Sequence, residues 1–168
     1  MAAVYLHTLK SAVPPPILSA LMLGSYRRVV GQPLVPAGLD DAEAAHWLYE
    51  DASFCVLAHN TEIDPRFVYA NKTAQRCFEY SWAEFITLPS RLSAEAPNRA
   101  ERQRLLDRVT QNGFASNYTG VRISRSGRRF SIEDATVWQL LDDEGVAQGQ
   151  GAMLPRWHDV VPSQDIAQ

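Results

Sequence analysis

Few side chains in the sequence have the types and spacing that a catalytic or metal site requires. The four histidines, His7, His46, His59 and His158, are scattered and never stand three or four residues apart. No Cys-x-x-Cys pair is present either, so the ligand pattern of a zinc site is missing. The sequence also lacks Gly-x-Ser-x-Gly and the glycine-rich phosphate loop of nucleoside triphosphatases. We therefore expect no catalytic residues and no metal site, and we predict that the protein is not an enzyme.

Two adjacent carboxylates, Glu133 and Asp134, are the acidic pair that could take part in acid–base chemistry. On a strand, neighbouring side chains point to opposite faces, so the pair cannot serve one site together. One of them should face the helical layer, where a carboxylate is costly unless it is paired. Arg91 is a possible partner. A salt bridge between loop and sheet and a ligand contact are both open interpretations.

Arginines supply most of the positive charge, and several of them flank one predicted hairpin: Arg122, Arg125, Arg128 and Arg129. The group is either a solvated hairpin tip or a docking surface for an acidic partner. The net charge of −3 disfavours general nucleic-acid binding, which usually requires a basic excess.

Length and composition indicate an ordinary globular domain. The 168 residues suffice for one domain with a proper core, and 46% of them are hydrophobic. Cys55 and Cys77 cannot form the disulfide framework of a small secreted protein, and we expect buried free thiols and a cytoplasmic location. The apolar run from Val13 to Leu23 is interrupted by prolines and is too short to span a membrane. We therefore expect no membrane contact.

The stretch from Phe67 to Glu95 would organise the domain. It begins with a strand of aromatic and β-branched residues. Asn71 can then cap a helix, because its side-chain oxygen can accept a free backbone N–H of the first turn. Ser81 and Glu84 form a capping box for a second, short helix. Pro89 ends that helix, and a polar bend follows.

The N-terminal third should be helical. Residues Met1 to Pro16 are expected to form a flexible tail that ends in an extended run of prolines. Ile17 to Val30 has an apolar face and predicts an amphipathic helix. This helix either packs on its own domain or pairs with the same helix of a second chain, and the sequence favours neither. A further helix is expected from the capping box of Asp40 and Glu43.

The remaining pattern predicts an antiparallel sheet. Phe54 to Ala58 is a short apolar run typical of a central strand. A long helix is expected from Asn98, which would cap it with Glu101, to Asn112, where Gly113 would end it. Three strands should follow, with Gly149 and Gly151 at points of close approach in the last one, Val146 to Trp157. The middle strand would carry on one face Phe130, Ile132, Asp134, Thr136 and Trp138. The fold class is therefore α+β, with helices on one face of the sheet.

Three blocks carry a resemblance to a known family: Tyr69 to Glu95 (YANKTAQRCFEYSWAEFITLPSRLSAE), Ser126 to Trp138, and Gly24 to Leu34. They resemble the MEKHLA domain, a relative of the PAS domain that ends plant class III homeodomain-leucine zipper proteins and also forms stand-alone bacterial proteins. The resemblance covers roughly Gly24 to Trp157. It implies a PAS-like, five-stranded antiparallel sheet with the last strand beside the first, helices on one face, and additional N-terminal helices. The expected segments are an N-terminal tail (1–16), N-terminal helices (17–53), a PAS-like core (54–160) and a C-terminal tail (161–168).

The resemblance also implies a function: a non-catalytic sensory or interaction domain that binds a small molecule or a protein partner in signalling. Flavin photoreceptors of the light-oxygen-voltage type carry a reactive cysteine in an Asn-Cys-Arg-Phe-Leu-Gln motif. The corresponding region here, Ser90 to Arg99, has no cysteine, which disfavours a flavin adduct. Haem-binding PAS domains use a histidine on the long helix, and Asn98 to Asn112 has none. The cofactor therefore stays unknown.

Any ligand would lie between the sheet and the helices. The residues expected around it are Tyr69, Asn71, Phe78, Tyr80, Trp82, Arg91, Ser93, Asp134 and Trp138. Ordinary core packing is the alternative for the aromatic residues. Two other functions stay open: a small enzyme that uses the same pocket, and a ligand-free dimerisation scaffold. The expected partners are a small molecule and a second copy of the chain, bound through the N-terminal helix.

Overall fold

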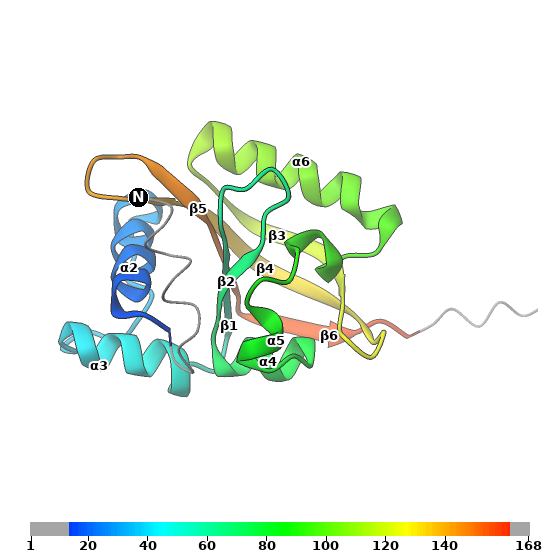
Figure 1. Cartoon of the computed structure of the whole chain (residues 1–168), viewed down its shortest axis with the longest axis horizontal. Helices are drawn as coiled ribbons and strands as arrows, with labels where there is room; N and C mark the ends of the chain where they lie inside the picture. Colours follow the sequence, from blue (N-terminus) through cyan, green and yellow to red (C-terminus); the bar gives the residue numbers. More distant parts are fainter. Residues whose placement is uncertain (1–13, 162–168) are drawn as a thin grey trace, which may run out of the picture.

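The protein is an antiparallel sheet with helices on both faces, seen in a computed structural model that describes residues 14–161 (Figure 1). The expected tails, 1–16 and 161–168, lie almost wholly outside the described residues. The strand order is β2-β1-β5-β4-β3, with β6 paired to β4. The strands are β1 Cys55–His59, β2 Phe67–Ala70, β3 Phe114–Ile123, β4 Arg129–Leu141, β5 Ala147–Leu154 and β6 Arg156–Asp159. The predicted α+β, PAS-like sheet is confirmed, including the placement of β5 beside β1.

The sheet has six strands rather than the predicted five. The expected last strand, Val146 to Trp157, is divided at Pro155, which has no backbone N–H to donate to a neighbouring strand. After this residue the chain pairs with the first half of β4, where Glu133 lies opposite Arg156.

The helices form in the predicted regions, and three of them begin at the predicted caps. They are α2 Pro16–Val30, α3 Asp41–His46 with the π-helical turn η1 Trp47–Asp51, α4 Lys72–Phe78, α5 Trp82–Phe85, the 3-10 turn η2 Ser90–Ser93, and α6 Ala96–Asn112. The side chains of Asp40, Asn71 and Ser81 each accept a backbone N–H at the start of α3, α4 and α5. Helix α6 begins before the predicted Asn98, because Pro97 occupies its first turn, where a missing N–H costs nothing.

Two cores lie on opposite faces of the sheet. The inner core joins the sheet to α4, α5 and α6, and it contains both cysteines, which are free and buried as predicted. The outer core joins the sheet to α2 and to the turn after α3. Figure 1 shows α2 and α3 on one side of the sheet and α6 on the other. The helices therefore cover both faces, with the N-terminal ones on the second.

Strand β4 changes face in its middle. Three residues after Ile132 reach Ala135, whereas the partner strand needs only two steps, from Gly120 to Tyr118, so β4 contains a bulge. Asp134 adopts a left-handed φ of 52° there. The bulge sends Phe130 and Ile132 into the inner core and Trp138 into the outer core. The prediction that these residues share one face is wrong for this reason.

Helix α2 packs on its own domain. Leu18, Met22 and Tyr26 are buried against the outer face, and the Tyr26 ring meets Trp138 edge-on with centroids 4.9 Å apart. Trp138 in turn lies against Gly151, where an added Cβ would stand 2.6 Å from the indole ring. The close approach predicted at Gly151 is thereby confirmed. Pairing of two chains through α2 stays a prediction, and it would have to use the residues of this helix that the sheet leaves uncovered.

Candidate functional site: a cavity between helix α6 and the sheet

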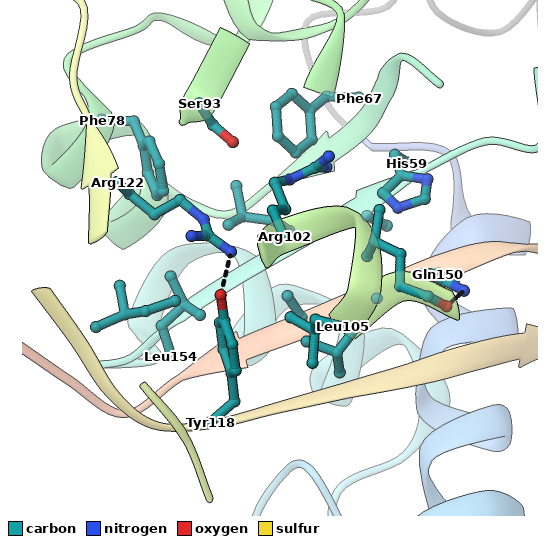
Figure 2. A pocket seen from close by; sticks show the side chains of 17 residues that line it. His59, Phe67, Phe78, Ser93, Arg102, Leu105, Tyr118, Arg122, Gln150 and Leu154 are labelled. Atoms are coloured by element: carbon teal, nitrogen blue, oxygen red, sulfur yellow. Dashed lines mark hydrogen bonds between the residues drawn. The ribbon is translucent and has the colours of Figure 1, made fainter. Parts of the chain in front are cut away.

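A hollow of about 50 Å³ lies between α6 and the inner face of the sheet (Figure 2). Apolar side chains form most of its wall: Leu57, Phe67, Phe78, Leu105, Leu106, Ile132, Val137 and Leu154. Six polar side chains also reach it: His59, Ser93, Arg102, Tyr118, Arg122 and Gln150. One enclosed water needs roughly 10–15 Å³ of such volume, so the hollow has room for a molecule of a few heavy atoms.

Local sequence explains how the polar residues reach the cavity. On α6, Arg102 stands three residues before Leu105, so both lie on the helix face toward the sheet. On β3, Tyr118 and Arg122 share one face with Gly120 between them. A Cβ at Gly120 would stand 2.4 Å from the Tyr118 hydroxyl and 3.1 Å from Nη1 of Arg122. The glycine therefore leaves the space in which these two side chains meet.

Arg102 is buried without a carboxylate. Its side chain donates one hydrogen bond, from Nη2 to the hydroxyl of Ser90 at 2.8 Å, and no ion pair of Arg102 is found within residues 14–161. Ser93 stabilises the same turn, because its hydroxyl donates to the Ser90 carbonyl oxygen at 2.7 Å. Burial, and secondarily the charge of Arg122, lowers the pKa of Arg102 to about 10. The guanidinium stays protonated at neutral pH.

Arg122 reaches a carboxylate only indirectly. Its Nη2 donates to the Tyr118 hydroxyl at 3.3 Å, and its Nη1 donates to the Val121 carbonyl oxygen at 2.9 Å. The Tyr118 hydroxyl donates in turn to Oε2 of Glu101 at 2.7 Å. The guanidinium also lies 5.5 Å from the centre of the Tyr118 ring. Burial raises the pKa of Tyr118, so its hydroxyl keeps the proton that this chain of hydrogen bonds requires.

Two acceptors at the other end of the cavity have unused capacity. His59 Nδ1 stands 2.9 Å from the Asn60 carbonyl oxygen, which can only accept, so Nδ1 carries the hydrogen and Nε2 has a lone pair. Burial is the main cause that lowers the pKa of His59 to about 4, so the ring is neutral. Gln150 donates through Nε2 to Leu106 and Thr110 of α6. His59 Nε2 and Gln150 Oε1 are both buried and have no hydrogen-bond partner in the described part of the chain.

Of the nine predicted ligand-wall residues, Phe78 and Ser93 line this cavity. Tyr69, Trp82 and Trp138 belong to the outer core instead, and Tyr80 packs beside Phe85 at the edge of the inner core. The Tyr69 hydroxyl and Trp138 Nε1 are buried in the outer core without a hydrogen-bond partner in the described part of the chain, so a ligand contact of these residues stays a prediction.

Asn71 has a structural role. Its side-chain oxygen accepts from the backbone N–H groups of Val56 and Ala74, each at 3.0 Å. Its Nδ2 donates to the carbonyl oxygens of Leu48 and Phe54, at 3.0 and 2.9 Å. The amide has no capacity left for a ligand.

The expected pairing of a β4 carboxylate with Arg91 in the helical layer is wrong. Asp134 forms an ion pair with Arg156 of β6, and Arg91 pairs with Asp64 at 3.1 Å. The bulge turns Asp134 outward, and β6, which was not predicted as a separate strand, supplies the positive charge.

Sequence reasoning missed Arg102, His59 and Gln150 and placed Arg122 in a hairpin tip. The remaining hairpin arginines do lie at that tip, where each forms an ion pair within the chain: Arg125 with Glu84, Arg128 with Asp159, and Arg129 with Glu95. A signal for Arg102 was available. It shares the helix face of Leu105 and Val109, and an arginine on an apolar face indicates a buried charge with a special role.

Two further features are absent from residues 14–161. No three side chains of His, Cys, Asp or Glu come together there in a way that could hold a metal ion. No helix in that range is long and apolar enough to cross a membrane. The cavity combines six polar side chains with a hollow of about 50 Å³.

Comparison with known proteins gives two consistent findings. The model of the MEKHLA domain family matches residues 17–159. The chain is similar to the homeobox-leucine zipper proteins ATHB-14 of Arabidopsis thaliana, with 28% identity over 66% of this chain and 13% of the relative, and HOX33 of Oryza sativa, with 26% identity over 86% of this chain and 17% of the relative. The chain thus spans less than a fifth of the length of these curated relatives.

Solved structures give the fold. A PAS domain from Colwellia psychrerythraea superposes with a TM-score of 0.60 at 11% identity, over 72% of this chain and 98% of that one. An RNA-binding light-oxygen-voltage receptor also superposes with a TM-score of 0.60, at 19% identity, over 77% of this chain and 35% of that one. At these identities the likeness concerns the fold alone.

Proposed function

Since this chain belongs to the MEKHLA domain family and has a PAS-like fold, we propose that it is a non-catalytic sensory domain that binds a small molecule between α6 and the sheet. The finding that carries the proposal is the unused hydrogen-bonding capacity in the cavity. His59 Nε2 and Gln150 Oε1 are buried without a partner, and Arg102 donates only one hydrogen bond. Buried polar groups are normally paired, so these groups favour an occupant of the cavity that supplies the missing partners.

Binding at this place would act on α6. The helix contacts β3 and β4, and Gln150 of β5 bonds the helix backbone and Thr110. An occupant between these elements would change the distance between helix and sheet. Such a shift would be passed on to a partner protein by contact, because interfaces and packed cores tend to switch between discrete arrangements. Both cysteines are free thiols, which fits our placement of this exchange in the cytoplasm.

The partner we propose is a second copy of the chain. Since the outer sheet face already buries Leu18, Met22 and Tyr26, a dimer through α2 would rely on its uncovered side, where Ile17 is 55% exposed. A ligand-free dimerisation scaffold is the alternative function, and it differs in one respect: the cavity would have no occupant besides water.

Native mass spectrometry of the freshly purified protein tests the proposal. We expect extra mass on the folded chain that disappears on denaturation. Ala152 lines the cavity, so the substitution Ala152→Val should reduce the bound fraction by filling the space. Ala147 is exposed on the same strand, and Ala147→Val is the matched control, which should retain the mass. A bare wild-type chain that is dimeric would contradict the sensor and support the scaffold.

A further inference from the structure

The ligand of this cavity, we propose, is a small carboxylate whose negative charge is bound by Arg102 and Arg122. The inference rests on the proposed function and specifies the chemical class of the ligand. Both arginines are more than nine-tenths buried, at 8% and 7% exposure, and both line the same hollow (Figure 2).

The two buried charges are not compensated directly. Arg102 meets a neutral hydroxyl, and Arg122 meets a neutral hydroxyl and a carbonyl oxygen. The nearest carboxylate in this network, Glu101, is reached only through Tyr118. By contrast, three arginines of the neighbouring hairpin, which are exposed or half-buried, each form an ion pair, although pairing in water gains little. A buried charge is costly unless it is paired, so the place where an anion would stabilise this fold most is the cavity.

The donor count fits an oxyanion. A guanidinium has five N–H groups in a planar fork that matches the two oxygens of a carboxylate. Arg102 uses one of its five, and Arg122 uses two bonds, one from each terminal nitrogen. Among residues 14–161 the side chains of Arg102 and Arg122 have no protein acceptor besides these three. The wall therefore retains several donors of charge-assisted hydrogen bonds.

The volume of the cavity and the two unpaired acceptors in its wall restrict the class of ligand further. About 50 Å³ admits roughly three to five water-sized groups, which is the size of acetate or glycolate. His59 Nε2 and Gln150 Oε1 are acceptors, so they suit a hydroxyl group or a bound water and not a second carboxylate. The geometry thus favours a small monocarboxylate, and a hydroxyl group on it would add a further hydrogen bond.

Thermal unfolding with charged and neutral isosteres tests the proposal. The protein is placed in sodium HEPES, whose anion is too large for the cavity, and is titrated with acetate or glycolate at constant sodium concentration. Acetamide and glycolamide have the same shape without the charge. We expect a saturable rise in the unfolding midpoint with the two carboxylates and no rise with the two amides. Glycolate should act at lower concentration than acetate.

Four substitutions locate the effect. Arg102→Gln and Arg122→Gln each replace the guanidinium with a shorter, neutral amide, so the side chain stays polar but the charge is lost. Both should lose the response to carboxylate. Arg104 is exposed on the same helix, so Arg104→Gln is the matched control and should respond as the wild type does. Ala152→Val, which fills the cavity and leaves both charges in place, should weaken the response independently of any effect of the glutamine substitutions on folding.

The outcomes separate this inference from the proposed function. A rise with amides that equals the rise with carboxylates, and that Ala152→Val abolishes, would leave the binding site standing and overturn the anionic ligand. A carboxylate response that persists in both glutamine variants would also overturn it, since binding would then occur elsewhere. No response to any of the four compounds overturns the carboxylate class, whereas the native mass spectrum decides whether the cavity has an occupant.

Discussion

The guanidinium of Arg102 donates a hydrogen bond of 2.8 Å to the hydroxyl of Ser90, so the first turns of α6 are tied to the turn that precedes the helix. Both residues are buried, and the acceptor is neutral. A ligand that binds Arg102 would therefore act on a residue that also determines how α6 meets the rest of the domain. Binding and helix position are thus linked through one side chain, which is what a sensory domain requires.

Asn71, the buried cap of α4, should contribute far more to the free energy of unfolding than Ser81, the exposed cap of α5. Asn71→Ala removes four hydrogen bonds and leaves buried backbone groups without partners, so we expect a loss of about 3 kcal/mol or more. Ser81→Ala removes an exposed cap and should cost about 1 kcal/mol. Chemical denaturation measures both. Equal losses in the two variants would mean that the Asn71 network contributes no more than a helix cap.

Such caps are also the part of the fold that the sequence predicts best. Asp40, Asn71, Ser81 and Gly113 each cap a helix within one turn, so these capping bonds follow from neighbouring residues, whereas the bonds of Asn71 to Val56, Leu48 and Phe54 do not. The strands β1 and β2 were likewise accessible from their apolar residues, and the placement of the final strand beside the first followed from the family resemblance.

Features that depend on non-local geometry were not accessible. The bulge at Asp134 is a consequence of pairing with β3, and it reversed the predicted face of Trp138. The cavity depends on how far α6 stands from the sheet, which no local pattern records. Arg102 and Arg122 are twenty residues apart in the sequence and meet only because α6 crosses over β3. For that reason just two of the nine predicted ligand residues, Phe78 and Ser93, line the cavity.

His59 should make the protein less stable in mild acid. Its pKa is about 4 in the folded protein, below the ordinary value of 6.5, so between these values the unfolded chain binds more protons. Stability contributed by the neutral ring is complete above pH 6.5 and is lost as the pH falls toward 4, by about 3 kcal/mol at most. The positive charge of Arg102 also lowers the pKa of His59.

Urea denaturation between pH 4 and 7 measures this slope. His59→Asn keeps an N–H donor near the Asn60 carbonyl and cannot titrate, so its slope should be distinctly smaller. His46 is exposed, and His46→Asn should keep the wild-type slope. If His59→Asn also retained the full slope, the acid sensitivity would have to come from other groups.

Helix α2 should contribute to the stability of its own domain. Met22 is fully buried in the outer core, so Met22→Ala should cost about 2–5 kcal/mol. Ile17 is exposed on the same helix, and Ile17→Ser should change stability by less than about 0.5 kcal/mol.

The same helix allows a test of dimerisation. If two chains pair through its uncovered side, Ile17→Arg should convert the dimer to a monomer in light scattering without loss of stability. An Ile17→Arg protein that stays dimeric would move the interface away from this side of α2. A Met22→Ala protein as stable as the wild type would contradict the packing of the helix on the sheet.

The binding of a small carboxylate by Arg102 is tested most directly by observing the guanidinium itself during a titration with acetate. Its Nε–H signal in a ¹⁵N-labelled sample can be assigned by its loss in Arg102→Gln. We expect a saturable shift of this signal, and of the Arg122 signal, with acetate, and no such shift with acetamide. If the Arg102 and Arg122 signals stay unchanged at acetate concentrations that shift the signals of exposed arginines, the two buried arginines do not bind a carboxylate.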